Sequence, residues 1–594
     1  MTAFNLTFLF AGFLIATALC VFVFKLVAKW DILDRLTEKL LVAILPVPLL
    51  IVTGWIFNDI LGSSWEMWNG ARLAPTIGLV HGYKLYYGID PGPILGTVYT
   101  PLNYLVYLPA AIASSPTVAI LIGISIAMAF YFLPVAWLLL GEYLDTYRKK
   151  GIALASFVGF WFLIYLIYEI SGGGLASIFS AICYFSAPLL WLNSKLLLEK
   201  CRAVIFGIWG FALFCLFTYY FESLAGVLRL HADAPALGIS ALAGAALYFR
   251  DEKNNFRALA ISATVAIAAF WTKQQALPLI FGLSTYVYLA DGRRCFWRYL
   301  ACLGVAAVSI STVLLLVFDP KQLILNAFTF PSNLPLTGEP KEVLFNAFRE
   351  IVQQSILFVT IVAFLAPHLN PPVREDRLLS WLIYNRWAMF LIVALFAIPS
   401  ALLARTRIGG NFNNLSFTVY FIAIAAILAI VKAASMPELQ RSVQTVVLCL
   451  SVCLLLIHVP LTVNTFNTLP NQKAILATNP QEYFYRYAKA NPGKAFFPWV
   501  PLANVMGEGK LYHFDYGVTD RILSGGEVSE QAFRAGIPKD MKFLVYPAAI
   551  PSHIGNVEET GVMKAVRKYL PDVSKSPVES TEIKLPGWQV YTSP

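Results

Sequence analysis

Long apolar runs constrain this chain more than any other feature, because a helix needs about 20 apolar residues to cross a lipid bilayer. The chain is 58% hydrophobic and only 13% charged, which is typical of a membrane protein. We therefore expect an all-α polytopic membrane protein with about 13–14 transmembrane helices. The runs of spanning length, or nearly so, cover residues 4–27, 40–61, 117–140, 152–170, 175–194, 203–226, 235–249, 258–272, 277–290, 299–318, 351–368, 387–403, 415–433 and 443–463.

Lys and Arg residues are distributed unevenly between the connectors of these runs. One alternating set of short connectors carries 21 of them, whereas the other set, which includes the long loops, carries nine. Cytoplasmic loops are enriched in Lys and Arg, so we expect the first set inside. The net charge of +10 therefore needs no nucleic-acid partner. The segments then expected outside are both chain ends and residues 62–101, 227–234, 272–276, 319–350 and 404–414.

This alternation requires that residues 102–113 do not span the membrane, and we expect them to lie as a helix at the outer interface. The outer loop 319–350 is broken by Pro and Gly and is predicted to be mobile. Three regions result: an extra N-terminal span with its cytoplasmic loop (1–39), a transmembrane catalytic domain (40–463) whose first outer loop covers 62–116, and a C-terminal domain (464–594).

The C-terminal region differs in composition from the rest, because its charge rises and the apolar runs stop. The patterns of Lys494–Val500 and Lys542–Tyr546 predict strands, and Gln481–Ala490 predicts a helix. About 130 residues suffice for a small α/β domain, which we expect outside the membrane. None of the eight cysteines falls in the loop 62–101 or after residue 463, so no disulfide framework is predicted in either.

A carboxylate stands where the chain leaves the second apolar run. Glu66 lies between Trp65 and Trp68, at the start of a polar, aromatic-rich loop. A carboxylate flanked by indoles at a membrane surface suits a catalytic base, with Asp90 of the same loop as the second choice. The alternative is an ordinary interfacial loop with a solvated Glu and two tryptophans at headgroup level.

Polar side chains also gather at the other expected outer boundaries. Cations on one face, opposite an acidic loop, suit a lipid-linked phosphate held at the interface. Each taken singly could equally be a connector residue or a charge that reaches out to the membrane surface. The candidate substrate-binding residues are Arg72, Lys84, Tyr99, Arg229, Asp233, Lys273, Gln274, Arg407, Asn411 and Asn414.

Several motifs follow one another over residues 40–435: Trp65-Glu66-Met67-Trp68, Gly82-Tyr83-Lys84-Leu85-Tyr86, Tyr99-Thr100-Pro101-Leu102-Asn103-Tyr104, Arg229 with Asp233, Thr272-Lys273-Gln274, and Gly409-Gly410-Asn411 with Asn414. Their order resembles the GT-C superfamily of integral-membrane glycosyltransferases, especially its protein O-mannosyltransferase and lipid A aminoarabinose transferase branch. No single motif is specific, and their order and shared sidedness carry the resemblance.

The resemblance implies a GT-C type fold, a polyprenyl-phosphate-linked sugar donor and an acidic base in the first outer loop. It also implies that the basic residue at the Thr272-Lys273 tip contacts the lipid phosphate. This chain departs from the family in two ways. Trp65-Glu66 stands where the family often has an Asp-Glu pair, and an additional N-terminal span precedes the usual first one.

These features predict a glycosyltransferase that passes a sugar from a polyprenyl-phosphate donor to a lipid, glycan or protein acceptor, with inversion. The alternative is a transporter or flippase of a lipid-linked saccharide, which would be expected to show charges in mid-membrane and a repeat between halves. No clustered metal-ligand signature is seen, and a divalent cation bound by outer-loop carboxylates stays open. We expect the bacterial inner (plasma) membrane, with the site and the C-terminal domain on its outer side.

Overall fold

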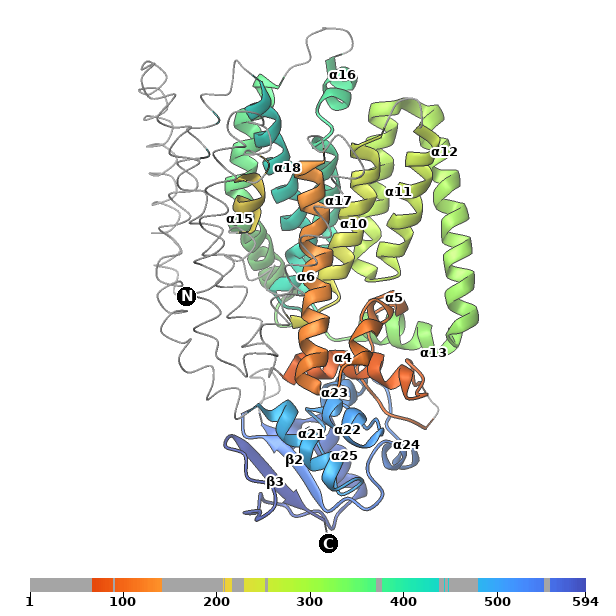
Figure 1. Ribbon diagram of the computed structural model, residues 1–594, viewed down its shortest axis with the longest axis vertical. Helices are drawn as coiled ribbons and strands as arrows, with labels where there is room; N and C mark the ends of the chain where they lie inside the picture. The colour runs from red at the N-terminus through yellow and green to blue at the C-terminus, as the bar shows by residue number, and fades with distance from the viewer. Residues whose placement is uncertain are drawn as a thin grey trace.

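The computed structural model describes residues 67–88, 91–141, 207, 209–215, 229–250, 255–369, 377–436, 443, 447, 479–549 and 556–593. The predicted spans 4–27, 40–61, 152–170 and 175–194 lie outside these residues, as do most of the spans 203–226 and 443–463. The described part of the chain is mostly helical, with a bundle of long helices and a C-terminal domain at one end (Figure 1).

The bundle closely follows the predicted apolar runs. Its long helices are α6 (Pro116–Leu140), α10 (Asp233–Tyr248), α11 (Asn255–Phe270), α12 (Leu277–Val317), α15 (Pro340–Leu365), α17 (Ala388–Arg405) and α18 (Ser416–Ser435). Five helical segments are long and apolar enough to cross a membrane: Pro116–Leu139, Gln274–Val317, Pro340–His368, Ala388–Arg405 and Phe412–Ala434. The predicted spans 277–290 and 299–318 form the two arms of α12, which kinks at Gly292, where φ is 81°.

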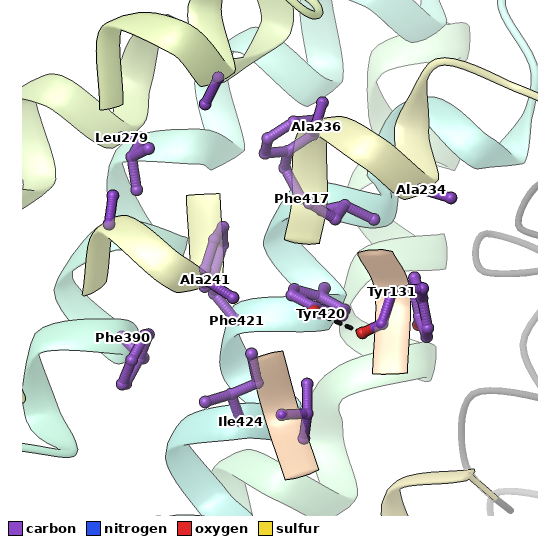
Figure 2. Close-up of a cluster of buried hydrophobic side chains, with 14 of the residues drawn as sticks. Tyr131, Ala234, Ala236, Ala241, Leu279, Phe390, Phe417, Tyr420, Phe421 and Ile424 are labelled. Atoms are coloured by element: carbon purple, nitrogen blue, oxygen red, sulfur yellow. Dashed lines mark hydrogen bonds between the residues drawn. The ribbon is translucent and has the colours of Figure 1, made fainter. Parts of the chain in front are cut away.

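Helix α18 lies at the centre of the described bundle. Every residue from Val419 to Val431 is buried, as expected for a helix that is apolar on all sides. It contacts α6, α10, α15 and α17. Aromatic side chains fill the space between these helices, and the Tyr420 hydroxyl donates to the Tyr131 carbonyl over 2.9 Å (Figure 2). This core holds the ends of α10 and α18 in fixed positions, and the candidate site is built on those ends.

Short helical segments connect the long ones. They are α4 (Met67–Val80), α5 (Pro101–Leu105), η1 (Leu108–Ile112), η4 (Gln274–Ala276), α13 (Pro320–Ile324), the π-helical turn η5 (Leu325–Thr329), α14 (Phe330–Asn333), η6 (Ala366–His368), α16 (Arg377–Tyr384) and η7 (Phe412–Leu415). The two short helices α5 and η1 lie within residues 101–112, too few for a span, which agrees with the prediction that residues 102–113 do not cross the membrane. The loop predicted to be mobile instead forms α13, η5, α14 and the first turns of α15.

The C-terminal domain has its own hydrophobic core and a three-stranded sheet in the order β1-β2-β3. Strand β1 (Ala495–Phe496) pairs parallel with β2 (Phe543–Pro547), and β3 (Trp588–Thr592) pairs antiparallel with β2, with Leu544 opposite Tyr591. Its helices are α21 (Pro480–Ala490), α22 (Pro501–Glu508), α23 (Asp515–Leu523), α24 (Glu530–Ala535), η9 (Val557–Glu559) and α25 (Gly561–Tyr569). The strands and helix predicted near 494, 542 and 481 are confirmed, although β1 is short. Strand β3 was not predicted.

The orientation of the bundle in the membrane leads to a labelling prediction. Ser332 and Ser576 are both exposed, one beside the bundle and one in the C-terminal domain. If the Lys- and Arg-poor side is the outer one, Ser332→Cys and Ser576→Cys should both react with an impermeant maleimide in intact cells. An introduced cysteine at Arg294, exposed beside the kink of α12, should react only after lysis. The reverse pattern would contradict the orientation.

Candidate functional site

The candidate site lies where the bundle meets the C-terminal domain. Figure 1 shows α4, α5, α13 and α23 gathered between the two parts. The segment predicted as the first outer loop, the turn after α11 and the segment before α18 reach the same end, because hydrogen bonds join them to one another. Gln274 donates to the carbonyls of Val98 and Ala327, and Gln275 donates to the Asn414 side chain over 3.0 Å.

A buried carboxylate is the centre of this site. Asp233 begins α10 and is paired with the ammonium of Lys273, which lies between α11 and η4. The two side chains are only 2% and 4% exposed. Asn413 donates to the same carboxylate over 2.9 Å and Ser416 over 3.2 Å. A buried charge that is paired and fully hydrogen-bonded is compatible with a stable fold, whereas an unpaired one is not.

His231 extends this network toward the first outer loop. Its Nδ1 contacts the Asp233 carboxylate, and its Nε2 lies 2.8 Å from the Tyr99 hydroxyl. Burial lowers the pKa of His231 to about 4, although the Asp233 carboxylate opposes this shift, and the Arg72 guanidinium lowers it further. The imidazole is therefore neutral at pH 7, in a site that already contains an ion pair.

Lys273 and Asp233 were both predicted site residues, and the structure brings them together. Burial lowers the pKa of the Lys273 ammonium, while the Asp233 carboxylate opposes the shift. Because Asp233 neutralises this ammonium, Lys273 is not presented as an open cation. Its contact with a lipid phosphate stays a prediction.

Three other predicted residues join segments of the chain, and a fourth, Asn411, caps η7. Gln274 tethers the first outer loop to η5, and the Asn414 amide donates to the Ala404 carbonyl over 3.3 Å. The Arg407 guanidinium donates to the Leu334 carbonyl over 2.6 Å, and the exposed Asn411 side chain accepts from the backbone of Phe412. These contacts shape the rim of the site, and no described contact brings Arg407 or Asn411 to Asp233.

The remaining predicted cations lie on or near the first outer loop. Arg72, on α4, donates to the carbonyl of Arg229 and lies 5.5 Å from the centre of the Trp68 ring. The Arg229 side chain is exposed, two residues before His231. Lys84 is also exposed, and its backbone N–H donates to the Tyr87 hydroxyl. Arg72 and Arg229 therefore place two cations beside the buried network.

Glu66 and Asp90, the two candidate bases, lie outside the described residues, as does Trp65. The neighbouring Trp68 packs edge-on against Tyr516 and Trp499 of the C-terminal domain, with ring centres 4.8 and 5.7 Å apart. These contacts place the half-buried Trp68 ring against the C-terminal domain, and its position at headgroup level stays a prediction.

Helix α23 fastens the C-terminal domain to the first outer loop. Arg521 donates to the carbonyls of Tyr87 and Gly88, and the Phe514 backbone donates to the Ile94 carbonyl over 2.8 Å. The backbones of Gly96 and Gly517 touch, since a Cβ on Gly517 would lie 2.2 Å from the Gly96 nitrogen. Several contacts therefore join the first outer loop to the C-terminal domain.

This close approach gives a prediction about Gly517. Gly517→Ala should lower the free energy of unfolding by about 1–3 kcal/mol, because the new methyl group meets backbone atoms that cannot swing aside. Gly304→Ala is the matched control, because it is also helical and nothing lies within 4 Å of its Cβ position. Helix propensity favours alanine at both sites, so the difference between their melting temperatures measures the clash. Equal melting temperatures would contradict the close approach.

The same helix carries two acids with shifted titration. Burial raises the pKa of Asp515 to about 7 and that of the half-buried Asp520 to about 8. Asp520 acts on the site through its charge, which raises the pKa of Tyr99 and Tyr516. Buried His513 has the opposite shift, to about 4.

These shifts predict how stability depends on pH. Between pH 6.5 and 8 the folded protein still holds protons on Asp515 and Asp520 that the unfolded chain has lost, and these outnumber the protons that the unfolded chain holds on His231 and His513. The free energy of unfolding should therefore fall as the pH rises from 6.5 to 8. Asp515→Asn should flatten the fall measured by thermal denaturation. A melting temperature that rises over this range would contradict the assignment.

Sequence reasoning did not single out His231, Asn413, Ser416 or Asp520 as site residues. For His231 a signal was visible in the sequence. It stands two residues before Asp233 at a helix start, and two titratable groups at that spacing can share one partner. Asp520 gave no signal, since only the docking of α23 brings it here. A cavity of about 220 Å³ lies at the opposite end of the bundle, beside Arg386 and Lys432, and is separate from this site.

Among the described residues, no group of three or more His, Cys, Asp or Glu side chains could hold a metal ion. No protein-family model, curated protein or solved structure matches the chain. The resemblance to the GT-C superfamily therefore stays a prediction of the sequence.

Proposed function

We propose that this protein is an integral-membrane glycosyltransferase that moves a sugar from a polyprenyl-phosphate donor to a lipid, glycan or protein acceptor, with inversion. The observation that carries the proposal is the polar network around Asp233 at the end of an apolar bundle. Polar and ionisable groups are costly in such surroundings and usually mark a functional site. We further propose that this end faces outward from the inner membrane of a bacterium.

The charges at the rim suit the leaving group of this reaction. As the bond between the sugar and the phosphate breaks, negative charge grows on the phosphate, and nearby cations stabilise it. We assign this role first to Arg229, which is exposed, and to Arg72, which donates to the Arg229 backbone. Lys273 contributes indirectly, because its ammonium is paired with the Asp233 carboxylate. The acceptor proton needs a base, which the sequence assigns to Glu66 or Asp90.

The first experiment measures turnover directly. The purified protein in liposomes is mixed with polyprenyl-phosphate-linked hexoses or pentoses, and mass spectrometry follows release of the free polyprenyl phosphate. Arg229→Gln should slow this release, whereas Arg293→Gln, an equal charge change on an exposed residue beside Gly292, should not. Envelope glycans of a deletion strain then identify the acceptor. Intact donor with every sugar, together with unchanged glycans, would refute the proposal.

The alternative predicted from the sequence is transport of a lipid-linked saccharide. The same liposomes separate the two functions, because a flippase moves a fluorescent donor between leaflets and leaves its sugar–phosphate bond intact. A transferase breaks that bond whether or not the lipid changes leaflet. Movement without cleavage would favour the transporter.

A further inference from the structure

A continuous line of hydrogen bonds runs from the buried ion pair to the first outer loop. It passes from Asp233 through the His231 imidazole to the Tyr99 hydroxyl. The three residues come from the start of α10, from the turn before it and from the loop before α5. This order of groups is that of a proton relay, in which an acid orients a histidine and the histidine takes a proton from a hydroxyl.

The direction of the hydrogen bonds follows from the chemistry of Asp233. Its oxygens already accept from Lys273, Asn413 and Ser416, so the carboxylate is ionised and can only accept. The His231 Nδ1 must therefore carry the hydrogen. The lone pair of Nε2 then points at Tyr99, whose hydroxyl donates to it over 2.8 Å. Nε2 is thus a base that faces two donors, the Tyr99 hydroxyl and the Asn413 amide nitrogen 3.3 Å away, of which only the hydroxyl can give up its proton.

The backbone before His231 is held in an unusual conformation. Leu230 has a φ of 45°, the only non-glycine positive φ among the described residues. A branched or bulky side chain in this region costs free energy, and such positions concentrate at functional sites. Leu230 is buried, and its methyl groups reach within 2.9 Å of where a Cβ of Gly123 would stand. Packing against α6 therefore fixes the turn that aims His231.

We propose that His231 accepts the proton of the acceptor hydroxyl through Tyr99. This assignment rests on the proposed glycosyl transfer and names its proton acceptor. The acceptor oxygen bonds to the anomeric carbon as the bond from that carbon to the phosphate oxygen breaks, and the electron pair leaves with the phosphate. The acceptor proton moves to the Tyr99 oxygen as the Tyr99 proton moves to Nε2. Asp233 stabilises the resulting imidazolium, which returns its proton to the departing phosphate or to water.

Burial keeps the imidazole neutral before the reaction, and two nearby cations add to this effect while Asp233 opposes it. Arg72 and Lys273 are the cations whose charges act on it, and Asp233 is the anion that Lys273 already balances. Asp520, from α23, faces Tyr99 from the C-terminal domain. Because the imidazole starts neutral, its Nε2 can accept a proton at pH 7. In this assignment His231 takes the role that the sequence predicts for Glu66 or Asp90, and the turnover of Glu66→Gln and Asp90→Asn separates the two assignments.

The test compares two ways of changing the same hydrogen bonds. His231→Gln keeps an amide that donates to Asp233 and a carbonyl that accepts from Tyr99, but it cannot accept a proton. We expect the melting temperature to stay within a few degrees of the parent, while turnover of the polyprenyl-phosphate donor falls about 100-fold or more. Tyr99→Phe should cause a similar fall. Tyr107→Phe is the matched control, because the Tyr107 hydroxyl reaches only the His231 backbone carbonyl, at 3.4 Å.

Each result of this experiment either supports or overturns the relay. Loss of turnover in His231→Gln and Tyr99→Phe, with Tyr107→Phe near the parent, supports the relay. Turnover within threefold of the parent in the first two variants overturns the relay and leaves the transferase function intact. An equal fall in all three variants, with equal loss of melting temperature, assigns the network to packing and overturns the relay. A parent protein that cleaves no donor overturns the proposed function, and the relay with it.

Discussion

Replacing Asp233 by Leu is expected to destabilise the protein by about 3–5 kcal/mol, because the Lys273 ammonium would stay buried without its carboxylate. Both side chains are almost fully enclosed, so water cannot replace the lost partner. Asn413 and Ser416 would lose their acceptor as well. Denaturant unfolding in detergent micelles, followed by tryptophan fluorescence, measures the change.

Two further variants show whether the pair itself is responsible. Asp233→Leu combined with Lys273→Met should recover a large part of the loss, because removing both partners of a buried pair is often close to neutral. Glu530→Gln is the control, since Glu530 pairs with Arg534 in α24 with both side chains about half exposed. That change should cost at most about 1 kcal/mol. A double variant as unstable as Asp233→Leu alone would show that the ion pair is not the cause.

Glu66→Gln is expected to lower turnover of a polyprenyl-phosphate donor by about two to four orders of magnitude if Glu66 is the general base. The substitution keeps the shape of the side chain and removes its ability to accept a proton. Membrane insertion and melting temperature should stay unchanged, so the effect would appear in turnover alone. Release of polyprenyl phosphate, counted by mass spectrometry, measures it.

The same assay ranks the other base candidates. Near-normal turnover in Glu66→Gln would move the role to Asp90, to be tested as Asp90→Asn. If both variants turn over normally while His231→Gln does not, the base is the imidazole. Glu482→Gln is a matched control, because Glu482 accepts from the Thr117 backbone at the junction of α6 with the C-terminal domain, away from Asp233.

Much of the described bundle could be predicted from the sequence, because the bounds of an apolar helix are set locally. Residues 117–140 were predicted as a span, and α6 covers Pro116–Leu140. Residues 415–433 correspond to α18 in the same way. The predictions failed where polar segments fold onto other parts of the chain. The segment 319–350 has weak local signals, and it folds because Arg407 and Gln274 bond to its backbone.

The candidate site was predictable only in its parts. Lys273 and Asp233 were identified because charges at the ends of apolar runs are conspicuous. Their pairing could not be predicted, since it joins residues 40 positions apart through the packing of α10 against α11. Lys273 was predicted to contact the phosphate as an open cation because its partner Asp233 could not be recognised from the sequence. Trp68 and Asp520 depend on how the C-terminal domain docks, which no local pattern records.

The position of the Asp233–Lys273 pair has a consequence for how this chain enters its membrane. Asp233 begins α10 and Lys273 follows α11, so the two charges lie at the open end of one helical hairpin. If that end faces outward, both charges must cross the hydrocarbon layer during biogenesis. A hairpin that inserts as one piece carries them as a hydrogen-bonded, neutral pair, which costs far less than moving either charge alone. The two helices are therefore expected to leave the translocon together.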